Sequence, residues 1–314
     1  MEKGIVKLRW VLLVLMIIAF LDLLYLYTKD YSSYFNNRRG IFARATLTPA
    51  GGDSLTEKTW LIVENTDGFK VECGLLTPRD KSKRYPAIVL MGGKATGKYA
   101  VDYALDIRNV IIIAPDYPYE PKENYTITEF LIDVPEMRRA LLDMVPSVML
   151  LTDYLFRRSD VDTAKLVLLG YSFGAPFVPC IIANDRRAAV GVMVYGAGEL
   201  RTLIRHNVNR YEGKAISEFV GLLGGLLLRP LEPMRYIEQV SPTPFIMING
   251  TDDEMILREN VEALYAKAKE PKKKIWIESK HVNPRDLELT KKIIITLSNE
   301  LAGLGVLDST AVLP

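Results

Sequence analysis

The chain has 314 residues, of which 49% are hydrophobic and 25% charged, proportions typical of a globular protein with ample material for a core. Its formal net charge of +2 gives no electrostatic argument for nucleic-acid binding, and single α/β domains often reach this length. The two cysteines, Cys73 and Cys180, lie within predicted strand and helix interiors. We expect both to be free core thiols, because a disulfide requires the two to meet in the fold.

The N-terminal segment is strongly apolar. Residues 10–27 read WVLLVLMIIAFLDLLYLY, interrupted only by Asp22, and basic residues precede them. This length is at the short end of what crosses a bilayer, and no small-residue cleavage site follows. The pattern predicts a signal-anchor transmembrane helix within residues 1–28 and therefore a single-pass membrane protein. The preceding basic residues favour an extracytoplasmic location for the rest of the chain, although later basic residues reduce that bias; a packed apolar helix is the alternative.

Residues 29–58 are polar and are expected to form a tether, after which short apolar strands alternate with helical segments. Strands are expected at 59–65, 69–76, 85–91, 110–114, 166–169, 190–195, 244–249 and 274–277. Helices are expected at 130–157, 259–269 and 287–304, with a weaker one ending at residue 109. Thr66-Asp67-Gly68 joins the first two strands as a hairpin. This pattern predicts an α/β domain over residues 59–314, with helices on both faces of a mostly parallel sheet and an antiparallel hairpin at its edge.

The run KLVLLGYSFG at residues 165–174 places G-x-S-x-G between a predicted strand and a predicted helix. In that context a serine is held on a strained turn, with its hydroxyl exposed above the sheet edge. Gly170 and Gly174 suit the turn, because side chains there would clash with the closely approaching backbone. Ser172 is therefore the candidate nucleophile, and an ordinary glycine-rich turn is the alternative.

A serine hydroxyl becomes a good nucleophile when a histidine takes its proton and a carboxylate orients that histidine. The chain has two histidines. His281 follows a predicted strand in the order expected for the base, whereas His206 lies in a polar helical segment and is expected at the surface. The acid is expected at the end of the preceding strand, in NGTDDEM, where we prefer Asp253 to the adjacent Asp252.

The motifs GYSFG, PTPFIMINGTDD and WIESKHVNP occur in the chain order of nucleophile, acid and base. With them, residues 59–304 resemble the α/β-hydrolase superfamily, in particular dienelactone-hydrolase-like and prolyl-oligopeptidase-like serine esterases. The resemblance implies a serine hydrolase that cleaves a small-molecule ester or thioester through an acyl-serine, with a Ser-Asp-His triad and no cofactor. Two features depart from it: Ser172 stands where dienelactone hydrolases have cysteine, and the loop after the strand 85–91 reads MGGK rather than HGGG.

The same resemblance implies an oxyanion hole, in which backbone N–H groups stabilise a developing negative charge. One donor is expected from Phe173 and the other from Gly93 or Lys94. Candidate pocket residues follow the strand 110–114 at the same sheet edge: Asp116, Tyr117 and Tyr119. Residues 196–243 are too long a connection for one crossover helix, and we expect a small cap over the site, with an extra core helix as the alternative.

Other functions fit parts of the sequence. Residues 92–98 (GGKATGK) match the G-x-x-x-x-G-K of a nucleotide-binding P-loop, but Tyr99 stands where Mg²⁺ coordination needs Ser or Thr. A peptidase or an acyltransferase would use the same fold, and a non-catalytic binding protein with that fold is a further alternative. Two distant histidines without a Cys/His cluster predict no metal site.

Overall fold

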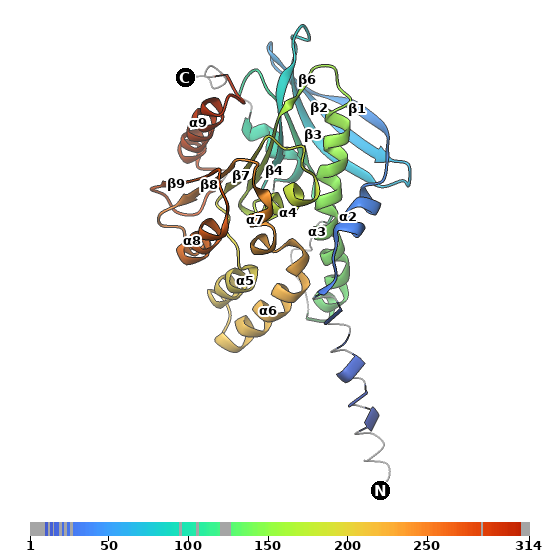
Figure 1. The fold of residues 1–314 in the computed structure, drawn as a ribbon, viewed down its shortest axis with the longest axis vertical. Helices are drawn as coiled ribbons and strands as arrows, with labels where there is room; N and C mark the ends of the chain where they lie inside the picture. Colours follow the sequence, from blue (N-terminus) through green and yellow to red (C-terminus); the bar gives the residue numbers. More distant parts are fainter. Residues whose placement is uncertain are drawn as a thin grey trace.

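The structure is a computed structural model, and it describes residues 28–93, 96–104, 107–119, 127–283 and 285–308, together with positions 10–11, 13–14, 16–18, 21 and 24–25. Within these ranges one nine-stranded sheet runs in the order β1-β2-β3-β5-β4-β6-β7-β8-β9, with helices around it (Figure 1). The strands are β1 Phe42–Gly52, β2 Thr56–Asn65, β3 Lys70–Pro78, β4 Tyr85–Met91, β5 Ile111–Pro115, β6 Val161–Tyr171, β7 Val190–Val194, β8 Phe245–Gly250 and β9 Lys272–Ile277. The helices and 3-10 turns are α2 Ser32–Arg39, η1 Gly97–Ala104, α3 Ile127–Leu155, η2 Ser172–Gly174, α4 Phe177–Asn184, α5 Leu200–Asn209, α6 Lys214–Leu227, η3 Arg229–Leu231, η4 Pro233–Arg235, α7 Ile237–Val240, α8 Arg258–Lys267 and α9 Leu287–Gly303.

The sheet changes direction along its width. β1, β2, β3 and β5 pair antiparallel in that order, whereas β5, β4, β6, β7, β8 and β9 form parallel pairs. β5, β7 and β8 are buried along their whole length, which explains their nearly continuous apolar sequences. The predicted fold class, a mostly parallel sheet with an antiparallel N-terminal hairpin, is confirmed.

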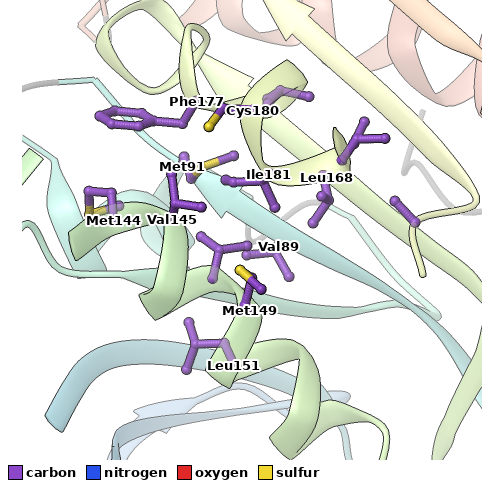
Figure 2. Close-up of a cluster of buried hydrophobic side chains, with 14 of the residues drawn as sticks. Val89, Met91, Met144, Val145, Met149, Leu151, Leu168, Phe177, Cys180 and Ile181 are labelled. Carbon is purple, nitrogen blue, oxygen red and sulfur yellow. The ribbon is translucent and has the colours of Figure 1, made fainter. Parts of the chain in front are cut away.

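Two hydrophobic clusters cover the two faces of the sheet, because alternate strand residues point to opposite sides. On one face, α3 and α4 pack onto residues such as Val89 and Leu168, in the cluster drawn in Figure 2. On the other face, η1 and α9 pack in a cluster with Leu90 and Leu169, the next residues of the same two strands. β4 and β6 therefore contribute to both cores in alternation.

The predicted membrane localisation is contradicted by the structure. In the part of the chain that the structure describes, no helix combines the length and the apolar character needed to cross a bilayer. The described positions between 10 and 25 are helical, and positions 1–9, 12, 15, 19–20, 22–23 and 26–27 of the predicted anchor lie outside the described residues. The extracytoplasmic placement depended on that anchor and loses its basis with it.

Residues 29–58 differ from the tether that their polar composition predicts, since they contain helix α2 and strand β1. α2 buries Phe35 completely, and its Arg38 pairs with the carboxylate of Asp143 on α3. β1 is the outermost strand, and none of its residues is buried. Residues 43–48 of this edge strand alternate between apolar and polar side chains, but a proline and two glycines follow them, and the polar, glycine-containing composition of 29–58 pointed to a loop.

Candidate active site

Strand β6 ends at Tyr171 and continues directly into the turn η2. Ser172 has a φ of +50°, in the left-handed region that L-residues seldom adopt, so the backbone is strained there. A Cβ on Gly170 would lie 2.5 Å from the carbonyl oxygen of Gly174, and a Cβ on Gly174 would lie 2.1 Å from that of Met91. Both positions therefore require glycine, and the turn holds Ser172 at the carboxyl end of β6, next to the end of β4.

Ser172, His281 and Asp253 form one chain of hydrogen bonds. Ser172 Oγ lies 2.9 Å from Nε2 of His281, and Nδ1 of His281 lies 2.8 Å from Oδ2 of Asp253. An ionised carboxylate only accepts hydrogen bonds, so Nδ1 of the neutral imidazole carries the proton and Nε2 accepts from the serine hydroxyl. The Asp253 side chain is 1% exposed and that of His281 is 10% exposed, so little water can compete for the hydrogen bond between them.

The loop after β8 distinguishes the two adjacent aspartates. Oδ1 of Asp253 accepts hydrogen bonds from the backbone N–H groups of Met255 and Ile256, at 2.8 and 2.9 Å, while its other oxygen faces His281. Asp252 is exposed and accepts from the hydroxyl of Thr251 at 2.8 Å. Because the loop itself binds one oxygen of Asp253, the second oxygen has a defined direction.

Two further groups contact His281 that the sequence did not single out. The ring of Tyr195, at the end of β7, packs edge-on against the imidazole with centroids 5.6 Å apart, and its hydroxyl hydrogen-bonds to Ser279. The carboxylate of Glu254 accepts from the backbone N–H of His281 at 3.4 Å. Hydrogen bonds from backbone N–H groups, its own first, lower the pKa of Glu254 from its usual value. Tyr195 stands directly after an apolar strand, and that position was the available signal for it.

The loop after β4 approaches the nucleophile through Gly92 and Gly93, which line the same cavity as Ser172 and His281. The hydroxyl of Tyr117 donates a hydrogen bond to the carbonyl oxygen of Gly92. That carbonyl and the N–H of Gly93 belong to one planar trans peptide and point in opposite directions, so Tyr117 also sets the direction of this N–H. The hydroxyl and the N–H of Thr96 both donate to the carbonyl oxygen of Gly93, at 2.9 and 3.0 Å.

Tyr117 contacts both segments that the sequence associates with an oxyanion hole. Besides its bond to Gly92, its ring packs edge-on against that of Phe173, with centroids 5.1 Å apart. Burial raises the pKa of the Tyr117 hydroxyl well above its ordinary value, so the group stays protonated and able to donate. Lys94, the other expected source of a donor, lies outside the described residues.

The three residues expected to line a pocket have other contacts. Neither Asp116, Tyr117 nor Tyr119 is among the residues that line the cavity at Ser172. The carboxylate of Asp116 pairs with Lys98 at 3.0 Å, and the hydroxyl of Tyr119 donates to Asp133 at 3.2 Å. These side chains therefore support neighbouring segments and do not line the cavity.

Among the described residues of 92–98, the lysine of the G-x-x-x-x-G-K pattern, Lys98, binds carboxylates of the protein itself. The ammonium group of Lys98 pairs with Glu72 at 2.8 Å and with Asp116 at 3.0 Å. Hydrogen bonding to Glu72, with a smaller contribution from Asp116, raises the pKa of Lys98 above its usual value. Its charge is therefore already neutralised by two carboxylates. Among the described residues, no group of three or more His, Cys, Asp or Glu side chains could hold a metal ion.

A cavity of about 340 Å³ opens beside Ser172 and His281, on the face of the sheet covered by η1 and α9. Its described lining residues are Leu90, Gly92, Gly93, Thr96, Ala100, Tyr103, Ala104, Ile107, Leu169, Tyr171, Ser172, Met255, His281, Val282, Thr290, Ile293, Ile294 and Leu297. Most of these side chains are apolar, and the volume is within the range of small-molecule sites. The reactive groups thus lie at the mouth of an apolar space.

The helices α5 and α6, which the sequence predicts to belong to a cap at 196–243, lie together at one end of the molecule (Figure 1). α5 contacts the loop that carries Asp253, since Nε2 of His206 lies 2.9 Å from the carbonyl oxygen of Glu254. None of residues 196–243, all of which are described, lines the cavity. The segment supports the acid loop, and a cap over the site stays a prediction.

Comparison with known proteins places the candidate site within a matched region. A family model described as "Serine hydrolase (FSH1)" matches residues 138–293, just under half of the chain, a range that includes Ser172, Asp253 and His281. "Uncharacterized protein YfhR" of Salmonella typhimurium is 33% identical over 147 residues, and its namesake in Escherichia coli K12 is 30% identical over 127 residues. These matches cover 45% and 40% of this chain and 47% and 41% of the relatives, so the chain spans less than half the length of the relatives it matches.

Solved structures resemble most of the chain. Acetyl xylan esterase 1 from a Thermoanaerobacterium species superposes with a TM-score of 0.63 and 14% identity, covering 86% of this chain and 94% of its own. A cold-adapted esterase from an Arctic intertidal metagenomic library superposes with a TM-score of 0.54 and 14% identity, covering 80% and 98%. At such identities the likeness concerns the fold, and it establishes the α/β-hydrolase fold that the motifs predict.

Proposed function

We propose that this chain, which has the α/β-hydrolase fold, is a serine hydrolase that hydrolyses a small-molecule carboxylic ester through an acyl-serine. In this proposal Ser172 is the nucleophile, His281 the general base and Asp253 the group that orients His281. The observation that supports it most directly is the pair of hydrogen bonds, 2.9 and 2.8 Å long, that joins the three side chains. Both similar solved structures are named as esterases, which favours an ester over a peptide.

Acylation begins when Oγ of Ser172 attacks the ester carbonyl carbon while its proton passes to Nε2 of His281. The π electrons of the carbonyl bond move onto its oxygen and form a tetrahedral oxyanion. When the carbonyl re-forms, the bond to the alkoxy oxygen breaks, the electron pair leaves with that oxygen, and the proton on His281 neutralises it. Asp253 stabilises the imidazolium that exists between these steps. Water then attacks the acyl-serine in the same way, releasing the acid and restoring Ser172.

The oxyanion is stabilised in this proposal by the backbone N–H groups of Phe173 and Gly93. Such a donor contributes about 3–4 kcal/mol when it is aimed at the tetrahedral oxygen rather than at the ground-state carbonyl. The contacts of Tyr117 with both segments support this pairing, because one side chain holds the two donors in a common arrangement. Tyr117 acts here as a positioning residue. Lys94 stays the alternative second donor that the sequence predicts.

A fluorophosphonate probe tests the nucleophile. We expect mass spectrometry to place one adduct on the peptide that contains GYSFG, and Ser172→Ala to abolish labelling and to lower kcat on p-nitrophenyl acetate by about 10⁶-fold. Ser82→Ala, which changes an exposed serine in the loop between β3 and β4, is the matched control and should leave both readouts unchanged. Labelling that persists in folded Ser172→Ala would rule the mechanism out.

A further inference from the structure

We propose that the cavity beside Ser172 binds a straight aliphatic chain, so that the substrates are esters with a medium-length alkyl chain on either the acid or the alcohol, a proposal that rests on the proposed ester hydrolysis. The cavity of about 340 Å³ opens at the nucleophile, and its described lining includes no Asp, Glu, Lys or Arg. The opening at the nucleophile and the absence of these charged side chains point to an uncharged, apolar ligand.

The floor of the cavity comes from two adjacent parallel strands. Leu90 of β4 and Leu169 of β6 are register partners, and both point to the face covered by η1 and α9. Two residues further along each strand, Gly92 and Tyr171 also line the cavity, and Ser172 follows directly. The apolar floor is therefore continuous with the reacting groups, and a chain lying on it would be joined to an ester carbonyl at Ser172.

The two walls differ in side-chain size, and that difference leaves the space open. The η1 wall contributes the buried Ala100 and Ala104, each with a single methyl group, and the exposed Tyr103. The α9 wall contributes the larger Ile293, Ile294 and Leu297. Methyl groups do not reach across to the opposite helix, so the volume between η1 and α9 stays free. A larger residue on either wall would fill it.

The chemistry of the lining selects among ligands. The leucine, alanine and isoleucine side chains of the floor and walls have no hydrogen-bonding groups. At the mouth, the Thr96 hydroxyl is already used in a bond to the carbonyl oxygen of Gly93, and Ser172 is bonded to His281. Three further hydroxyls also line the cavity, those of Tyr103, Tyr171 and Thr290. A sugar or a carboxylate that lies along the leucine, alanine and isoleucine side chains would lose most of its hydrogen bonds to water, whereas an alkyl chain loses none and gains burial.

The volume sets the length of the chain. One water molecule occupies about 30 Å³ of the liquid, so the cavity corresponds to roughly eleven such volumes. With a methylene group of similar bulk, and with room needed for imperfect packing, we expect chains of roughly six to ten carbons to fill the cavity.

Two substrate series test the proposal and identify which side of the ester enters the cavity. The acyl series runs from p-nitrophenyl acetate through butyrate, hexanoate and octanoate to decanoate, and the alcohol series compares ethyl, hexyl and octyl acetate. We expect kcat/KM in one series to rise about fourfold with each added methylene until the cavity is full. A rise confined to one series assigns the chain to the acid or to the alcohol, and rates highest for the shortest ester in both series would overturn the proposal.

Neighbouring residues of α9 provide matched variants. Ile294 lines the cavity, whereas Ile295 does not and is 40% exposed. Ile294→Trp should lower the ratio of kcat/KM for the best long-chain ester to kcat/KM for acetate by about fifteen- to sixtyfold, which corresponds to the burial of two or three methylenes. Ile295→Trp should leave the whole profile unchanged. Ala104→Leu fills the cavity from the opposite wall and should shorten the preferred chain in the same way, with melting temperatures measured for every variant.

Binding to Ser172→Ala separates this proposal from the proposed function. We expect calorimetry to show that n-octanol binds more tightly than n-butanol, with a negative heat-capacity change, and that adding Ile294→Trp weakens octanol binding. If octanol binds but the unaltered protein hydrolyses no ester, the aliphatic cavity is supported and the proposed function is wrong. If the protein hydrolyses acetate esters in a Ser172-dependent way but shows neither a chain-length preference nor octanol binding, the proposed aliphatic cavity is wrong and the proposed function is supported.

Discussion

The two faces of the central sheet share the same strands but differ in how completely they are filled. Under α3 and α4, Met144, Val145 and Met149 are fully buried against the strands, and Figure 2 shows these side chains close to Val89 and Leu168. Under η1 and α9, the carboxyl ends of β4 and β6 border a cavity of about 340 Å³. One face is a close-packed core and the other combines a core with a binding space.

The difference follows from the elements that cover each face. α3 spans Ile127–Leu155 and presents large Met, Leu and Val side chains, whereas η1 spans only Gly97–Ala104 and presents alanines to the cavity. A close-packed interior has low compressibility, so the filled face holds β4 and β6 in position. Because the reactive groups lie at the ends of these strands, the filled face positions the chemistry that takes place on the open one.

After the loss of Ser172 itself, the largest expected effect comes from removing the charge that orients His281 on the open side. Asp253→Asn should lower kcat by about 10⁴-fold, because an amide at this position favours the wrong imidazole tautomer. Asp252→Asn is the matched control, since Asp252 is exposed and contacts Thr251. Steady-state rates on one ester measure the difference between the two variants. If Asp253→Asn is as active as the unaltered protein, another acid must orient His281.

Substitutions at two adjacent residues of β6 compare how tightly the two faces are packed. Leu168→Ala creates a void in the filled core and should lower the free energy of unfolding by about 2–5 kcal/mol. Leu169→Ala should lower it by at least about 1 kcal/mol less, because Leu169 already borders the cavity, and should extend the preferred chain length. Urea unfolding measures both losses. Equal losses would show that the two faces are packed alike.

A smaller effect should follow from the hydroxyl that orients the loop after β4. Tyr117→Phe removes the bond to Gly92 and should lower kcat about ten- to hundredfold, less than the loss of a whole oxyanion donor, with KM nearly unchanged. Tyr119→Phe is the matched control, because its hydroxyl bonds to Asp133 on α3. A role limited to folding would instead lower the melting temperature and raise KM, and that pattern would contradict the assignment.

The smallest effect is expected from the polar side of α5, a helix that does not line the cavity. His206→Ala removes one hydrogen bond to the carbonyl oxygen of Glu254 and should reduce stability by about 1 kcal/mol. Fluorophosphonate labelling and kcat/KM should stay within about twofold of the unaltered protein. A loss comparable to that of Asp253→Asn would show that the acid loop depends on α5 for its geometry.

Much of the fold could be predicted because its signals are local. The apolar runs at 110–114, 190–195 and 244–249 correspond to β5, β7 and β8, which are buried along their whole length. Cys73 and Cys180 are free and buried, as predicted. α2 and β1 could not be predicted in the same way, since a polar helix and an edge strand are stabilised by partners elsewhere in the chain.

By itself, the sequence determined the order of the buried strands and the longer helices, the fold class and the tight turn at Ser172, because burial and backbone sterics leave short-range patterns of apolar residues and glycines. The tertiary structure decided which contacts surround that turn. The bond between Tyr117 and Gly92, and the cavity between η1 and α9, join residues far apart in the chain. No local pattern encodes such distances, since they depend on how whole elements pack across the sheet.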